Sequence, residues 1–266
     1  MPSPRDTPPP IVDAVGALRR VYGRSGHRQA LLAALFWSAW VWVPLVLAIA
    51  DDEVMAAVTL LVGVPVAGLQ LARLQALAMH RESGRRGKAP GFGPVVGAAL
   101  GGVVVAGVLG GLYTVVVVLA VEVADEWGRE EEVTLFLFLG LVLVFGLGHA
   151  MAFWGRLLAR AAVPGGGGRY GDAFAYGMKR MLIPGPELGL CALGMVAWLL
   201  LWGLFDVLPL GGDLVRHIDH DLADVFGAMV AATLVTAQLA IALPVMLVDV
   251  FGIREPPEED VESAYR

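Results

Sequence analysis

The chain of 266 residues is 57% hydrophobic and 17% charged, and its mean hydropathy is +0.70. Soluble domains average about 45–50% apolar and about 25% charged residues, so this composition excludes a soluble globular fold and a disordered chain. The net charge is −6, and the single cysteine, Cys191, excludes both an intrachain disulfide and a thiolate metal cluster. The sequence therefore predicts an all-α integral membrane protein.

The residues before the first long apolar stretch predict two different segments. Residues 1–10 hold five of the 16 prolines and are expected to be disordered. Residues 11–27 predict an amphipathic helix at the membrane surface, with arginines away from its apolar face. That face consists of Ile11, Val15, Leu18 and Tyr22. The alternative is a short water-exposed helix on the cytoplasmic side.

Six apolar stretches are long enough to span a bilayer, because a hydrocarbon core about 30 Å thick needs about 20 apolar residues in a helix. Together they form a transmembrane domain over residues 28–253, followed by an acidic tail at 254–266 that is expected to be loose. The predicted spans are 30–50, 55–79, 95–121, 133–154, 188–205 and 228–250.

The basic residues predict the orientation of these spans. All but three of the 19 lysines and arginines lie before the first span, between the second and third, between the fourth and fifth, or in the tail. The exceptions are Arg73, Arg129 and Arg216, and the intervening connections are acidic. Positive charge near helix ends is retained on the cytoplasmic side. The sequence thus predicts a multi-pass protein of the plasma (cytoplasmic) membrane with both termini in the cytoplasm.

An external segment before the last span carries the most chemically suggestive cluster. At 100° per residue, its carboxylates and imidazoles share one helical face, where they could bind a divalent metal or sense pH. The alternative is the solvated polar face of an interfacial helix, which needs polar groups of no particular kind. The cluster consists of Asp213, His217, His220, Asp221 and Asp224.

Polar groups within the spans are costly, and they are treated as functional candidates. Arg73 in the second span and Asp249 in the sixth could form a pair, extended by Gln70 and Gln238 into a polar pathway. The alternative is that Arg73 extends its guanidinium to the headgroups and that Asp249 lies in the interface.

Glycines spaced four apart predict close helix packing, because lipid matches the apolar contact of a leucine and helices associate where backbones can approach. The third span is expected to be central, either within the bundle or at a subunit contact. The alternative is that glycine is simply frequent in membrane spans. The candidate packing positions are Gly97, Gly101, Gly107, Gly111, Gly185 and Gly189.

No hydrolase, metalloprotease, P-loop or dinucleotide motif is present, so no catalytic residue or cofactor is predicted. Topology accounts for the basic segments, and no nucleic-acid partner is expected. The favoured interpretation is a non-catalytic structural or accessory subunit, with a membrane protein or a second copy as partner. In topology, nearly the whole chain resembles the membrane subunits of some ABC exporters, which implies a permease with a separate ATPase. A metal-dependent membrane protein is the third hypothesis.

Overall fold

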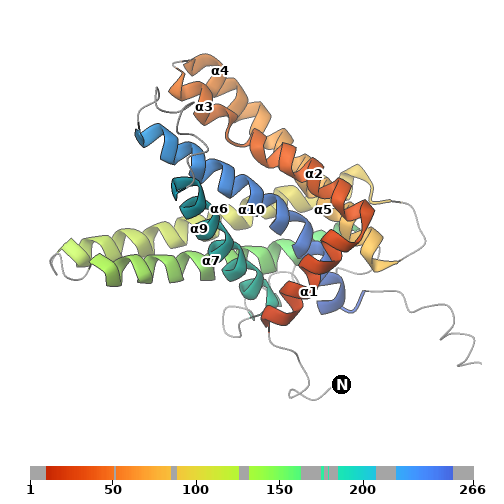
Figure 1. The fold of residues 1–266 in the computed structure, drawn as a ribbon. Helices are drawn as coiled ribbons and strands as arrows, with labels where there is room; N and C mark the ends of the chain where they lie inside the picture. Colours follow the sequence, from red (N-terminus) through yellow and green to blue (C-terminus); the bar gives the residue numbers. More distant parts are fainter. Residues whose placement is uncertain are drawn as a thin grey trace, which may run out of the picture.

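The computed structural model describes residues 10–50, 52–84, 89–125, 132–162, 175–176, 179, 185–207 and 220–253. Every element in this part of the chain is a helix (Figure 1), which confirms the all-α prediction there. The elements in chain order are α1 (Pro10–Gly23), α2 (Ser25–Trp40), α3 (Val43–Ile49), α4 (Glu53–Val58), η1 (Thr59–Gly63), α5 (Val64–Ser83), α6 (Phe92–Asp125), α7 (Glu132–Ala162), α9 (Pro186–Val207) and α10 (His220–Val250).

Among the described residues, four helical stretches are long and apolar enough to cross a membrane. They are Ser25–Ile49, Glu53–Ser83, Pro186–Leu204 and Phe226–Val250. Their outer surfaces are apolar, as Val54 (75% exposed) and Leu61 (74% exposed) illustrate. Exposed apolar surface on this scale marks contact with a membrane or a partner. The fold is therefore that of a membrane-associated helical protein.

The last helix, α10, is the centre of the structure. It packs against α1, α2, α5, α7 and α9, and residues 241–248 are buried on every side of the helix. A helix that is apolar all round is suited to such a central position. Within the chain, α10 and not the third expected span holds the central place, and a third span at a subunit contact stays a prediction.

The third and fourth expected spans instead form a hairpin at the edge. Helices α6 and α7 run side by side, and the end of α6 and the beginning of α7 project beyond the other helices (Figure 1). Helix α6 packs against α7 and α5, while α7 also contacts α9 and α10. The 34 residues of α6 extend about 51 Å at 1.5 Å per residue, well beyond a hydrocarbon core of about 30 Å. A helix of this length fits a bilayer by tilting or by extending beyond it.

The first two expected spans are interrupted helices. A turn at residues 41–42 separates α2 from α3, which has Pro44 in its first turn. The π-helical η1 lies between α4 and α5, and α5 begins with Pro65 near its N-terminus. A Cβ atom on Gly63 would lie 2.7 Å from the indole nitrogen of Trp40. Glycine at this position therefore permits η1 and α2 to approach each other closely.

Helix α1 packs on the other helices through a row of buried residues that lies beside the apolar face indicated by the sequence. It packs against α9 and α10 through Ala14, Ala17 and Val21, which are at most 1% exposed. Val15 and Tyr22 of the expected apolar face are about half exposed. Small side chains allow α1 to lie close to its neighbours, and α1 is thereby part of the helical packing.

Two glycines in the left-handed region end the helices that meet near α1. Gly84 has φ of +71° after α5, and Gly252 has φ of +61° after α10. Glycine adopts this conformation without a Cβ penalty and commonly ends helices. After Gly252, the Ile253 amide donates to the Val248 carbonyl at 3.0 Å. These ends place Glu82 and Asp249 in the last turns of their helices.

Candidate functional site

The most unusual polar residue in the structure is Glu82, in the last turn of α5. Its side chain is fully buried, yet it lies against three basic side chains from the N-terminal helices. Arg24 donates a hydrogen bond from Nη1 to Glu82 Oε2. His27 Nε2 lies 3.1 Å from the same oxygen, and Arg20 Nε lies 3.5 Å from Oε1. Because a buried charge is costly unless paired, these groups must be held together in the folded state.

Arg20 extends this cluster to the central helix. Its Nη2 lies 2.8 Å from Oδ2 of Asp249, in the last turn of α10. Arg20, Arg24, His27, Glu82 and Asp249 are called the ion cluster below. Through these contacts, residues from α1 and α2 join the ends of α5 and α10. The arrangement can fix the position of α1 on the bundle.

The structure gives Asp249 a different partner from the Arg73 that the sequence suggested. Arg73 is exposed, nine residues before Glu82 on α5, or about 13 Å along the helix axis. Arg20 contacts both Glu82 and Asp249, so Asp249 lies near the end of α5 rather than near Arg73. Gln70 and Gln238 are half-buried on α5 and α10.

Glu82 was not predicted from the sequence, because the basic residues around it were interpreted only as indicators of membrane topology. The arginines before the first span and around residue 81 also fit the rule that positive charge stays on the cytoplasmic side. A single acid next to several basic residues at one predicted helix end was the available signal. An acid in that position is unfavourable at a helix C-terminus unless cations neutralise it, which is the pairing that the structure shows.

A second polar cluster lies near the end of α10, at the beginning of α9. Glu187 in the first turn of α9 is 1% exposed and accepts a hydrogen bond from the Tyr176 hydroxyl at 2.5 Å. The Tyr176 ring meets Phe251 edge-on at 5.2 Å. The Arg156 guanidinium lies 4.6 Å from the Phe251 ring centroid, within the range of a cation–π contact. This cluster joins α7, α9 and the end of α10.

The structure describes the positions of three of the five candidate metal-binding residues. His220 begins α10, and Asp221 and Asp224 lie in its first turns. Asp213 and His217 lie outside the described residues, as do the segments 1–9 and 254–266. No group of three histidine, cysteine or acidic side chains that could hold a metal ion occurs in the described part of the chain.

The glycines expected at helix contacts behave differently from one another. A Cβ on Gly101 would lie 3.2 Å from Leu157 Cδ1, whereas Gly107 and Gly111 face open space. Gly97 is half-buried, and Gly185 and Gly189 are buried. Closer approaches occur at glycines outside the expected set, where an added Cβ would lie within 3.0 Å of a neighbouring side chain. These are Gly63, Gly102, Gly148, Gly155 and Gly194.

The outer part of the ion cluster is expected to contribute little stability. The side chains of Arg20 and Asp249 are 29% and 44% exposed, so water screens their attraction. A double-mutant cycle with Arg20→Ala and Asp249→Ala should give a coupling free energy of about 0.2–1 kcal/mol, typical of exposed pairs. Thermal unfolding in detergent measures it, and a coupling energy several times larger would contradict the exposed character of this pair.

In comparisons with known proteins, no family model, curated protein or solved structure matches the chain.

Proposed function

We propose that the protein is a multi-pass protein of the cytoplasmic membrane that crosses the bilayer six times, with both termini in the cytoplasm. The contact between Arg20 and Asp249 supports an even number of crossings, because it joins the segment before the first span to the end of the last one. The concentration of arginines around the ion cluster supports a cytoplasmic location for this end of the bundle.

Within this membrane, the protein acts as a non-catalytic subunit of a larger assembly. The observation that supports this role is the α6–α7 hairpin, which leaves the bundle (Figure 1). Gly107 and Gly111 on α6 have open space around them, beside the exposed Val103, Val104 and Val108. Small residues on an apolar surface allow a helix of another subunit, or of a second copy, to approach its backbone.

Affinity purification in a mild detergent, followed by mass spectrometry, tests this role. The wild-type protein should retain a membrane protein, or a second copy, in a fixed ratio. Gly107→Leu combined with Gly111→Leu should abolish this association, because the larger side chains occupy the open surface. Gly203→Leu is the matched control, since Gly203 on α9 also faces open space outside the hairpin. A monomeric wild-type protein without a stoichiometric partner would contradict the proposal.

A permease-like subunit of an exporter is the second candidate. It is favoured by α1, which lies directly before the first expected span and packs across the ends of α9 and α10. A separate ATPase would then have to supply the energy. Recovery of an ATPase in a fixed ratio in the same purification would favour the exporter over the accessory role, and an assembly without one would favour the accessory role.

A further inference from the structure

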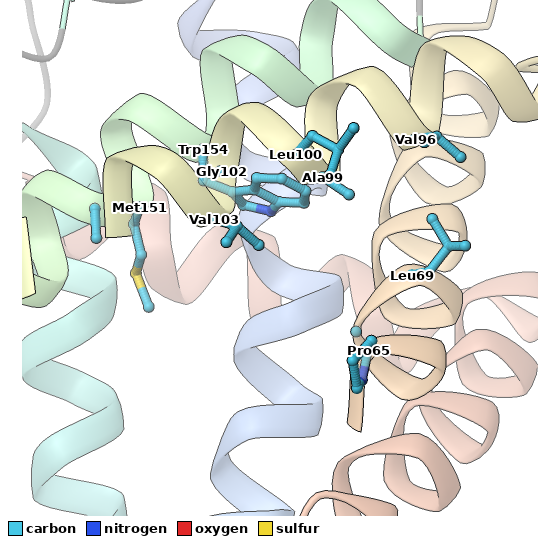
Figure 2. Close-up of a pocket in the computed structure, with 11 residues that line it drawn as sticks. Pro65, Leu69, Val96, Ala99, Leu100, Gly102, Val103, Met151 and Trp154 are labelled. Carbon is cyan, nitrogen blue, oxygen red and sulfur yellow. The ribbon is translucent and has the colours of Figure 1, made fainter. Parts of the chain in front are cut away.

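An apolar cavity of about 590 Å³ lies between α5, α6 and α7 (Figure 2). Its volume falls within the range of about 300–1,000 Å³ that is usual for small-molecule sites. None of the described residues that line it carries a charge. Its walls include Pro65 and Leu69 from α5, Leu100 and Val103 from α6, and Met151 and Trp154 from α7.

The Trp154 side chain is fixed in the wall of this cavity by two neighbours. Its indole nitrogen donates a hydrogen bond to Gln75 Oε1 at 2.7 Å. Its ring lies against Gly102, where a Cβ would come within 2.6 Å of the ring (Figure 2). Gly68 on the opposite wall has no side chain, and an added Cβ there would meet nothing within 4 Å. The space between the helices is therefore held open by the packing around it.

The uncharged, apolar lining of the cavity favours an apolar ligand. The Trp154 N–H already has an acceptor, and a polar ligand would lose its hydrogen bonds to water in an uncharged apolar cavity. Water is disfavoured for the same reason, because buried water needs several polar partners. The cavity opens onto the outer surface of α6, where its lining residues Leu100 (63%) and Val103 (69%) are exposed, on a helix that we place in the membrane. Hydrocarbon is what surrounds such a surface in a bilayer.

We propose that this cavity binds one acyl chain of a bilayer phospholipid, inserted between α5 and the α6–α7 hairpin. The inference rests on the membrane location proposed above. The chain would fill the space that Gly68 leaves and lie against the indole ring of Trp154. It would thereby connect the hairpin to the rest of the bundle.

Photolabelling distinguishes an inserted chain from ordinary lipid contact. The purified protein is reconstituted in phosphatidylcholine vesicles that contain a phosphatidylcholine with a diazirine in its acyl chain, and labelled residues are mapped by mass spectrometry. Labelling is expected to be enriched at Leu69 and Met151 in the cavity over Leu32 and Leu200, which are exposed on α2 and α9. Gly68→Leu should abolish the enrichment by filling the cavity, whereas Gly203→Leu should preserve it.

The outcomes separate this inference from the proposed membrane location. Equal labelling of cavity and outer residues, or enrichment that survives Gly68→Leu, overturns the acyl-chain site and leaves the membrane location intact. The absence of labelling at all four residues would instead contradict the membrane location itself, and with it the inference. The melting temperatures of Gly68→Leu and Gly203→Leu are compared with that of the wild type. If Gly68→Leu is unfolded, its loss of labelling does not count, and the cavity-to-surface ratio in the wild type decides.

Discussion

Replacing Glu82 by glutamine is expected to lower the free energy of unfolding by about 1.5–3 kcal/mol, the usual contribution of hydrogen bonds to a charged group. The substitution preserves the shape of the side chain and removes its charge. Arg24 and Arg20 would then face a neutral amide at a fully buried position, and the contact with His27 would lose its carboxylate. Thermal or denaturant unfolding in detergent, followed by circular dichroism, measures the loss.

Glu53→Gln is the matched control for this prediction. Glu53 is an exposed acid in the first turn of α4, and surface substitutions usually change stability by less than about 0.5 kcal/mol. If the two variants unfold at the same denaturant concentration, the ion cluster does not stabilise the fold as described. Arg24→Gln should lie between them, because the Arg24 side chain is 50% exposed and water can compensate part of its loss.

Adding a single methyl group at Gly155 is expected to have the second largest effect. A Cβ at this position on α7 would lie 2.1 Å from Leu247 Cδ1 on α10, and Leu247 is fully buried. Because α10 is packed on every side there, the leucine has little room to move. Gly155→Ala should therefore carry an overpacking cost of about 1–3 kcal/mol in the free energy of unfolding, which is measured relative to Gly107→Ala.

Gly107→Ala controls for the change in helix propensity. Both substitutions replace glycine by alanine within a helix, and each gains about 1 kcal/mol in intrinsic propensity. Gly107 has nothing within 4 Å of an added Cβ, so no packing cost offsets the gain. The difference in unfolding free energy between the two variants isolates the α7–α10 contact. Equal stability of the two variants would contradict the close contact between α7 and α10 at Leu247.

The positions of the helices followed from the sequence because hydrophobicity and length determine where a chain can cross a membrane. The expected spans 95–121 and 188–205 lie within α6 (Phe92–Asp125) and α9 (Pro186–Val207). Interruptions were not predicted, although Pro44 and Pro65 lie close to them. Proline is tolerated at a helix start as well as within a span, so its presence alone does not locate a break.

The partners of individual side chains could not be read in the same way. The sequence places Asp249 and Arg73 toward the same end of their spans, but depth along a span does not indicate which helices touch. Its partner Arg20 lies on α1, whose docking depends on the small residues Ala14 and Ala17 rather than on its apolar stripe. The spacing of glycines indicates where two helices could approach closely. Which glycines make such a contact depends on the position of the neighbouring helix.

An even number of membrane crossings leaves both ends of the chain in the cytoplasm. Single cysteines placed at Ser3, Gly128 and Ser263 in a Cys191→Ala background can be probed in intact cells with a maleimide that does not cross membranes. Gly128, in the acidic connection between the third and fourth spans, should be labelled, whereas Ser3 and Ser263 should react only after permeabilisation. Labelling of one terminus but not the other in intact cells would contradict the account.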